Sequence, residues 1–167
     1  MTFVPKLISR EGVPAALEKA QRYRLLQEPE AAESICLDVL AVDADNQKAR
    51  ILHLLAVTDQ LGDELSAGLR RARELLPAIE DEYRRHYYGG IIFERYAMAK
   101  LRQGAPRAGE VAYEWLHKAM DSFEQAEAMR PEGNDEAVLR WNTCARVLAR
   151  DPAMAPPAPE TYEPSFD

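Results

Sequence analysis

The chain has 167 residues and a formal net charge of −7. This length fits one domain and is too short for two substantial enzymatic domains. Apolar residues make up 47% of the chain and charged residues 29%, which is ordinary for a globular protein and argues against disorder of the whole chain. The pI near 5.1 implies long-range repulsion from polyanions, so we expect neither nucleic acid nor a membrane surface as a partner.

The cysteines and the lack of long apolar runs indicate the compartment. Cys36 and Cys144 each fall at an apolar helical position with no second thiol close by, which is typical of buried structural thiols. The first residues lack the pattern of a signal peptide, and no stretch reaches the roughly 18 apolar residues that a membrane-spanning helix needs. We therefore expect a reduced, cytoplasmic setting.

Apolar residues recur at helical spacing along most of the chain, and no segment alternates with the period of two that marks a half-buried strand. Prolines in first turns and Asp, Asn and Gly between the apolar runs set the expected boundaries. The sequence thus predicts an all-α fold. The expected helices cover residues 13–27, 29–42, 47–61, 65–76, 80–103, 107–129 and 135–150, the last capped by Asn134.

Two of these helices carry packing information. Residues 47–61 are apolar on most sides, so this helix is expected between two neighbours rather than at an edge. Gly89 and Gly90 lie inside the fifth predicted helix, where each glycine costs about 1 kcal/mol relative to alanine. We expect the pair to mark close contact with a neighbouring helix, and a kink is the alternative.

By composition the chain divides into three parts: an N-terminal arm (1–12), a helical domain (13–150) and an acidic, proline-rich C-terminal tail (151–167). Five of the eleven prolines fall in the tail, so we expect it to be extended rather than helical. Its acidic and aromatic residues are typical of a groove ligand, and a disordered linker is the alternative.

One spacing of small and bulky apolar residues occurs twice, in the second and sixth predicted helices. In each set the first three residues share one stripe of a helix and the fourth stops the helix. The sets are Ala32, Cys36, Val39 and Ala44, then Ala119, Phe123, Ala126 and Pro131. A helical pair of this kind buries its stripe by stacking on a similar pair, which predicts an α-solenoid. The 33 residues from Ala44 to Pro77 match the period of such repeats.

These residues resemble the tetratricopeptide repeat (TPR) family over about residues 14–150. In the first unit, Ala20 and Tyr23 match the small and aromatic positions of the family's first helix, and Ala32 and Val39 match small positions of its second. The third unit matches through Gly90, Phe93, Ala119, Phe123, Ala126 and Pro131, and the second through Ala72 and Pro77. The resemblance implies a right-handed stack of helical pairs whose first helices line a concave groove that accepts peptides or helices of partner proteins.

Candidate groove residues come from the first, fifth and seventh predicted helices. Along the fifth, charged and aromatic residues recur at steps of three and four, so most of them share one face. Arginine and tyrosine are prominent in binding hot spots, whereas the alternative has the tyrosines packed between helices and the arginines in solvent. Asn142 is disfavoured in mid-helix, which suggests a side-chain hydrogen bond. The candidates are Gln21, Arg24, Arg84, Tyr87, Ile91, Arg95, Asn142 and Arg146.

The functional prediction is a non-enzymatic protein–protein interaction module that binds a peptide or helix of a partner in its concave groove. The alternative is a self-associating subunit whose end repeat or C-terminal tail docks on a second copy. An enzyme or small-ligand protein that uses Tyr87 and Arg95 is a third reading. No cofactor is expected, because phosphate-binding, nucleophile-elbow and dinucleotide motifs are missing from the sequence. His53, His86 and His117 lack ligand spacing, so no metal is expected either.

Overall fold

The computed structural model describes residues 2–62 and 64–156, and in these ranges it is built from helices and contains no strand. The all-α prediction is therefore confirmed. The same ranges hold two short 3₁₀ turns, η1 (Arg10–Gly12) and η2 (Leu76–Ala78), and seven α-helices. The α-helices are α1 (Val13–Leu25), α2 (Pro29–Val42), α3 (Gln47–Asp59), α4 (Leu65–Leu75), α5 (Glu82–Gln103), α6 (Ala108–Ala128) and α7 (Glu136–Arg150).

The helices begin at signals that the sequence carries. Prolines lie in the first turns of α1 and α2, where the missing N–H costs nothing. Asn46 caps α3 by accepting a hydrogen bond from the Ala49 amide at 2.9 Å. Asp81 accepts one from the Arg84 amide at 2.7 Å, so α5 begins at Glu82, two residues later than predicted.

The helix ends differ more from the prediction than the starts do. α1 ends at Leu25, two residues early, because Gln27 takes a left-handed φ of 64° in the short link to α2. α3 ends at Asp59, also two residues early. Gly104, with φ of 65°, ends α5 in the conformation that glycine adopts without strain.

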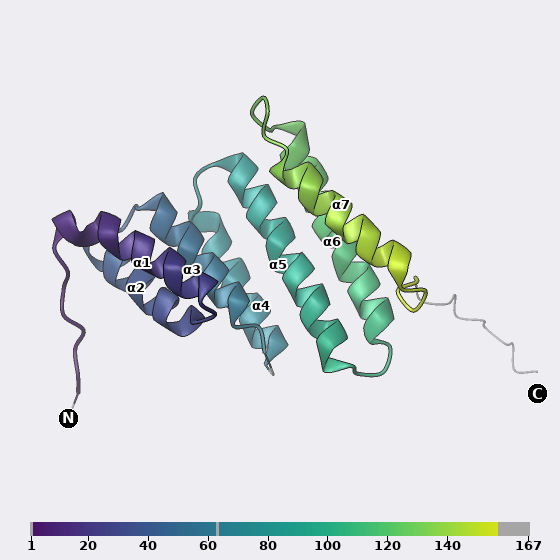
Figure 1. Cartoon of the computed structure of the whole chain (residues 1–167), viewed down its shortest axis with the longest axis horizontal. Coiled ribbons are helices and arrows are strands. Elements are labelled where there is room, and N and C mark those ends of the chain that lie inside the picture. The colour runs from purple at the N-terminus through teal and green to yellow at the C-terminus, as the bar shows by residue number, and fades with distance from the viewer. Residues whose placement is uncertain (1, 63, 157–167) are drawn as a thin grey trace, which may run out of the picture.

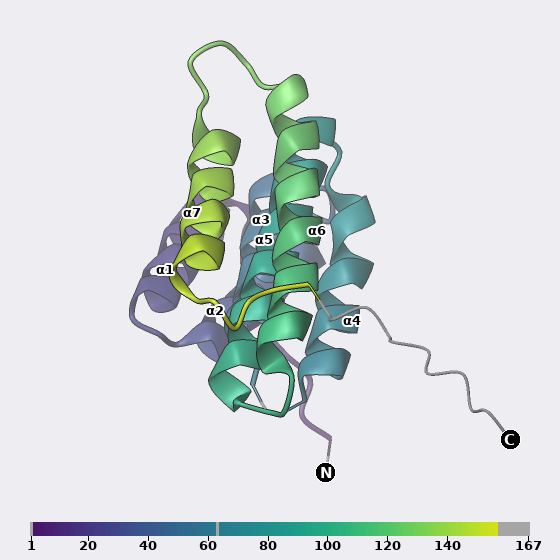
Figure 2. The same ribbon diagram turned by 90° about the vertical axis from the view of Figure 1, so that its right-hand side faces the viewer.

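Each helix packs mainly against its neighbours in the chain, and α5 and α6 make the most extensive pair (Figure 1). Further contacts join α1 to α3 and α3 to α5. Seen along the molecule, α7 lies on the same side as α1, whereas α4 and α6 lie on the other side (Figure 2). The surface formed by α1, α3 and α5 is called the inner face below.

The interior consists of three apolar clusters that follow one another along the molecule. The first joins α1, α2 and α3, the second joins α3, α4 and α5, and the third joins α5, α6 and α7. α3 contributes to the first two clusters and packs against α1, α2, α4 and α5. Its predicted position between neighbours is confirmed. Gly90 of α5 packs directly against Phe123 of α6, which confirms the close contact predicted at the glycine pair.

Both cysteines are buried free thiols, as predicted. Cys36 lies in the first cluster and Cys144 in the third. Burial raises the pKa of Cys36 to about 11 and that of Cys144 to about 12. Both thiols therefore stay protonated at neutral pH.

The packed body extends beyond both ends of the predicted helical domain (13–150). Ile8 packs against the first cluster, and Met154 is buried in the third. Residues 151–156 cross α6, where Gly109 leaves room for the carbonyl oxygen of Ala153 (Figure 2). The rest of the predicted tail, residues 157–167, lies outside the described residues. None of the described helices combines the length and apolar character that a membrane crossing requires.

Candidate functional site

The inner face carries a groove made of two cavities. The arginine cavity, of about 570 Å³, lies between the C-terminal ends of α1 and α3 and the second half of α5. The aromatic cavity, of about 650 Å³, lies between α1, α3 and the start of α5, with the α6–α7 connection at its edge. Arg24 lines both cavities. Together they are called the inner groove.

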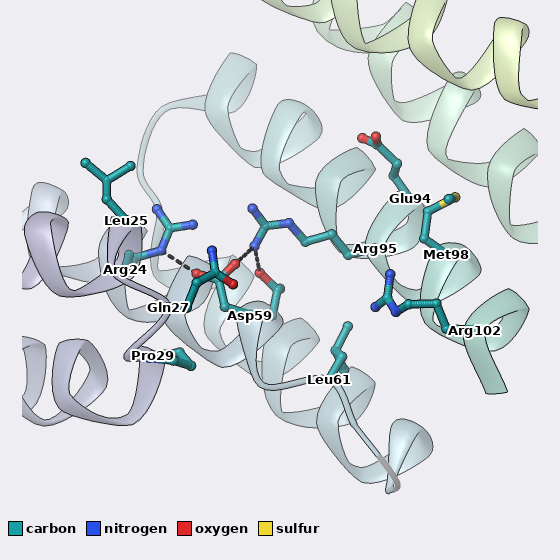
Figure 3. A pocket seen from close by; sticks show the side chains of 11 residues that line it. Arg24, Leu25, Gln27, Pro29, Asp59, Leu61, Glu94, Arg95, Met98 and Arg102 are labelled. Atoms are coloured by element: carbon teal, nitrogen blue, oxygen red, sulfur yellow. Dashed lines mark hydrogen bonds and ion pairs between the residues drawn. The ribbon is translucent and has the colours of Figure 1, made fainter.

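Three charged side chains from three helices meet in the arginine cavity (Figure 3). Nε of Arg24 donates a hydrogen bond to Oδ2 of Asp59 at 2.6 Å. Arg95 forms an ion pair with Oδ1 of the same carboxylate and donates to Oγ1 of Thr58 at 2.6 Å. Asp59, at the end of α3, therefore bridges α1 and α5.

Two of these three side chains, Arg24 and Asp59, lie at the C-terminal ends of their helices. Arg24 lies in the last turn of α1, where the negative end of the helix dipole stabilises a cation. Asp59 is the last residue of α3, and its own helix dipole disfavours a carboxylate at that end. The positive charges of Arg24 and Arg95 therefore stabilise the Asp59 carboxylate, which the dipole of α3 destabilises.

The arginine cavity keeps positive charge available to a ligand. A single carboxylate, that of Asp59, is shared by two guanidinium groups, and Arg102 lines the cavity about two helical turns after Arg95. Among the described residues, only Nε of Arg24 and one terminal nitrogen of Arg95 find protein acceptors. The other N–H groups of these two side chains remain open to an acceptor from outside.

Glu94 also lines the arginine cavity, but its carboxylate forms an ion pair with Arg140 of α7. The side chain is buried, and NH1 of Arg140 on α7 approaches its two carboxylate oxygens at 3.3 and 3.4 Å. Burial raises the pKa of Glu94, and the nearby Arg140 charge opposes that rise. This pair joins α5 to α7, and Asp59 is the acid that forms direct ion pairs with the two inner arginines.

The lining of the aromatic cavity combines apolar and aromatic side chains with polar ones. Leu52 and Leu55 of α3 line it together with Tyr83, Tyr87 and Tyr88 of α5. Tyr87 stacks on Tyr83 with ring centroids 6.0 Å apart and planes inclined by 8°. The Tyr87 ring also contacts Phe123 of α6, so it is held from several sides. A ring fixed in this way offers contact area at little cost in conformational entropy.

The rim of the aromatic cavity is polar and carries both signs of charge. Lys48 of α3 and Arg84 of α5 supply positive charge. Asp81 and Glu136 supply negative charge, but each lies at a helix start, where the helix dipole favours it. Met129, from the connection after α6, adds an exposed apolar side chain to the edge.

The hydroxyl of Tyr83 is buried at the edge of this cavity. Burial raises its pKa, and the nearby Asn134 side chain and Ala137 backbone partly oppose the rise. Neither group makes a hydrogen bond of normal geometry with the hydroxyl, which has no such partner within the described part of the chain. Tyr83 therefore stays protonated and keeps a donor under the α6–α7 connection.

Five of the eight predicted groove residues line the inner groove. Gln21, Arg84 and Tyr87 line the aromatic cavity, Arg95 lines the arginine cavity, and Arg24 lines both. The other three lie elsewhere. Ile91 is only 3% exposed and belongs to the third core cluster, whereas Asn142 and Arg146 lie on α7 and line neither cavity.

Sequence reasoning missed Asp59, which organises the arginine cavity. The sequence did contain an indication of this role. An acidic residue at the C-terminal end of a helix is destabilised by the helix dipole, so a cation from another helix is expected beside it. Leu52 and Leu55, which belong to the predicted helix that is apolar on most sides, also line the aromatic cavity. A helix that is apolar on most sides gives no indication of which apolar side chain borders a groove.

The three histidines lie apart from one another and outside the groove lining. Nε2 of His53 is 3.4 Å from Glu33, Nε2 of His86 is 4.0 Å from Glu82, and Nδ1 of His117 lies near the carbonyl oxygen of Tyr113. In residues 2–62 and 64–156, no three His, Cys, Asp or Glu side chains gather as a metal site would require.

Comparison of the chain with protein-family models, curated proteins and solved structures gives no match. The TPR resemblance therefore stays a prediction.

Proposed function

We propose that the chain is a non-enzymatic interaction module that holds a peptide or helix of a partner protein in the inner groove. The observation that carries the proposal is the pair of arginines at the centre of the groove, which keep unused N–H donors beside a rigid aromatic cavity. Arginine and tyrosine in a concave, partly apolar site are the side chains that contribute most to binding energy in protein interfaces.

The proposal includes a solenoid of TPR-like helical pairs. The sequential packing of the helices and the position of α1, α3 and α5 on one face support it. In this arrangement the pairs are α1–α2, α3–α4 and α5–α6, and α7 covers the open end of the last pair. The first helix of each pair would then line the groove.

Selection of randomised, surface-displayed peptides on the full chain tests the proposed function. We expect peptides that bind saturably and that lose at least about tenfold in affinity when Tyr87→Ala or Arg95→Ala is introduced. Arg73→Ala is the matched control, because Arg73 is exposed on α4 and lines neither cavity of the inner groove. Circular dichroism checks that each variant remains folded. Peptides that bind all variants equally, or a failure to select any saturable binder, would contradict the proposal.

Self-association is a second candidate function, which the N-terminal arm favours. Phe3, Val4 and Leu7 are 87%, 80% and 77% exposed, and such a run of exposed apolar side chains marks an interaction segment. Sedimentation equilibrium over a wide range of concentration tests it. We expect the mass to rise with concentration, and the rise to disappear in a Phe3→Ser, Leu7→Ser double variant.

A further inference from the structure

We infer that the segment held in the inner groove carries a large apolar anchor and, two helical turns away on the same face, an acidic side chain. This inference rests on the proposed function and adds the chemistry and the spacing of the ligand. The occupant is an internal segment of a partner protein, since a side-chain carboxylate at the right distance from the anchor satisfies both cavities.

The acidic side chain follows from the charge of the arginine cavity. Arg24 and Arg95 share the single carboxylate of Asp59, and the Glu94 carboxylate is bound by Arg140. The N–H groups that remain on the two arginines are directed to the groove, where a second carboxylate would receive charge-assisted hydrogen bonds (Figure 3). A chain with a net charge of −7 thus presents a locally basic site to an acidic ligand.

The apolar anchor follows from the shape of the aromatic cavity. Its volume of about 650 Å³ lies within the range of ligand pockets, and Leu52, Leu55 and Tyr87 supply apolar surface. Tyr87 is fixed by its neighbouring rings, so little side-chain entropy is lost when an apolar group packs against it. A Trp, Phe or Leu side chain can pack against these three side chains and remove apolar surface from water.

The spacing follows from the positions of the two cavities along the same helices. Tyr87 and Arg95 are eight residues apart on α5, which corresponds to about 12 Å at 1.5 Å per residue. Leu52 and Asp59 are seven residues apart on α3, which corresponds to about 10 Å. A ligand helix lying along the groove bridges that distance with residues i and i+7, which also lie on one face.

Three synthetic peptides test the inference by titration calorimetry with the full chain. Each is a helical, alanine-rich peptide with blocked ends, so that a terminal carboxylate is excluded. The first carries Trp at position i and Glu at i+7, the second replaces that Glu with Gln, and the third moves the Glu to i+5, on the opposite side of the helix. Residues common to all three peptides are kept identical.

We expect the first peptide to bind saturably, and the second and third to bind at least about tenfold more weakly. In an Arg24→Gln, Arg95→Gln double variant, the first and second peptides should bind alike. Arg73→Gln on α4 is the matched control and should keep the tenfold difference. Equal binding of the Glu and Gln peptides, equal binding at the two spacings, or no saturable binding by the first peptide would overturn the inference. Displayed peptides that need Tyr87 and Arg95 but lack the acidic residue would overturn it while leaving the proposed function in place.

Discussion

Gly90 of α5 and Phe123 of α6 share one packing position. A Cβ atom built on Gly90 would lie 2.5 Å from Cε1 of Phe123 and within 3.0 Å of two more ring atoms. The ring therefore fills the space that a side chain at position 90 would take. A glycine in mid-helix costs about 1 kcal/mol, and the full burial of Phe123 contributes about 2–3 kcal/mol, which offsets that cost.

Gly90→Ala should destabilise the protein by about 1–3 kcal/mol, because the added methyl group forces Phe123 or the α5–α6 contact to shift. Urea unfolding followed by circular dichroism measures the loss. Gly89→Ala is the matched control, since its Cβ would meet only Leu76 Cδ2 at 3.4 Å, an ordinary contact. It should be neutral or stabilising by up to about 1 kcal/mol. Equal effects at the two positions would contradict this account of the glycine pair.

The segment after α7 should also matter for stability. Met154 is 8% exposed in the third core cluster, and Gly109 leaves room for the Ala153 carbonyl. We expect Met154→Ala to lower the free energy of unfolding by about 1–3 kcal/mol. Gly109→Ala should have a similar effect, because a Cβ there would collide with backbone rather than with a flexible side chain. Ala155→Ser, at an exposed neighbouring position, is the control. Unchanged denaturant midpoints in both test variants would mean that this segment does not stabilise the fold.

Local signals explain which parts of the fold the sequence predicts. Helix starts depend on one proline or one capping side chain, as with Pro29 and Asn46, and these are visible in the sequence. Helix ends depend on how the chain turns toward the next element, so the left-handed residue Gln27 was not anticipated. The burial of Met154 is a long-range contact, and composition alone assigned that residue to the tail.

The groove was less predictable because it depends on how three helices come together. The spacing of Arg84, Tyr87 and Arg95 correctly indicated a shared face of α5. The same spacing included Ile91, which the structure places in the core. Asp59 lies between two arginines because α3 packs against both α1 and α5. The spacing of residues within one helix cannot predict such a contact between helices.

The two cysteines should be unreactive in the folded protein. Burial raises the pKa of Cys36 to about 11 and that of Cys144 to about 12, so almost no thiolate is present at pH 8. We expect Ellman's reagent to label neither thiol on the timescale of minutes, and to label both at once in denaturant. The slow labelling of the native protein should be limited by how often the protein unfolds. Rapid labelling of one thiol in the native protein would show that its cluster opens locally.

Glu33 joins three helices and lines neither cavity of the inner groove. From α2 it accepts a hydrogen bond from Nε2 of Gln60 at 2.6 Å, forms an ion pair with Arg71 of α4, and lies 3.4 Å from His53 of α3. Burial alone would raise the pKa of Glu33. The Gln60 hydrogen bond and the charges of Arg71 and His53 outweigh it, so the pKa lies below its ordinary value of 4.5.

A lowered carboxyl pKa stabilises the fold above the unfolded-state value near 4.5, and this stability is lost as the pH falls through the folded-state value. Glu33→Gln should therefore reduce the free energy of unfolding by about 1–3 kcal/mol at pH 7. The difference from the parent protein should shrink as the pH falls below about 4.5. Glu18→Gln, at an exposed position on α1, is the control. A Glu33→Gln effect that is the same at pH 7 and pH 3 would exclude the ionised carboxylate as its source.

Asp59 neutralises part of the positive charge of Arg24 and Arg95, so it weakens their attraction for an acidic ligand. Asp59→Asn removes its charge but keeps one oxygen for Arg24 or Arg95. We expect the peptide with Trp at i and Glu at i+7 to bind the variant about tenfold more tightly, because the freed guanidinium groups gain a full charge partner only from the ligand. The same change should cost about 1 kcal/mol of stability, since these side chains are partly exposed, at 17–27%.

Titration calorimetry with that peptide and urea unfolding measure the two effects of Asp59→Asn together. Asp45→Asn is the matched control, because Asp45 pairs with Arg50 outside the inner groove and is 88% exposed. It should change neither quantity. Weaker binding by the Asp59→Asn variant would mean that the carboxylate holds the two arginines in position for the ligand. Tighter binding with a small loss of stability would show that the charge of Asp59 lowers the affinity of the two groove arginines for an acidic ligand.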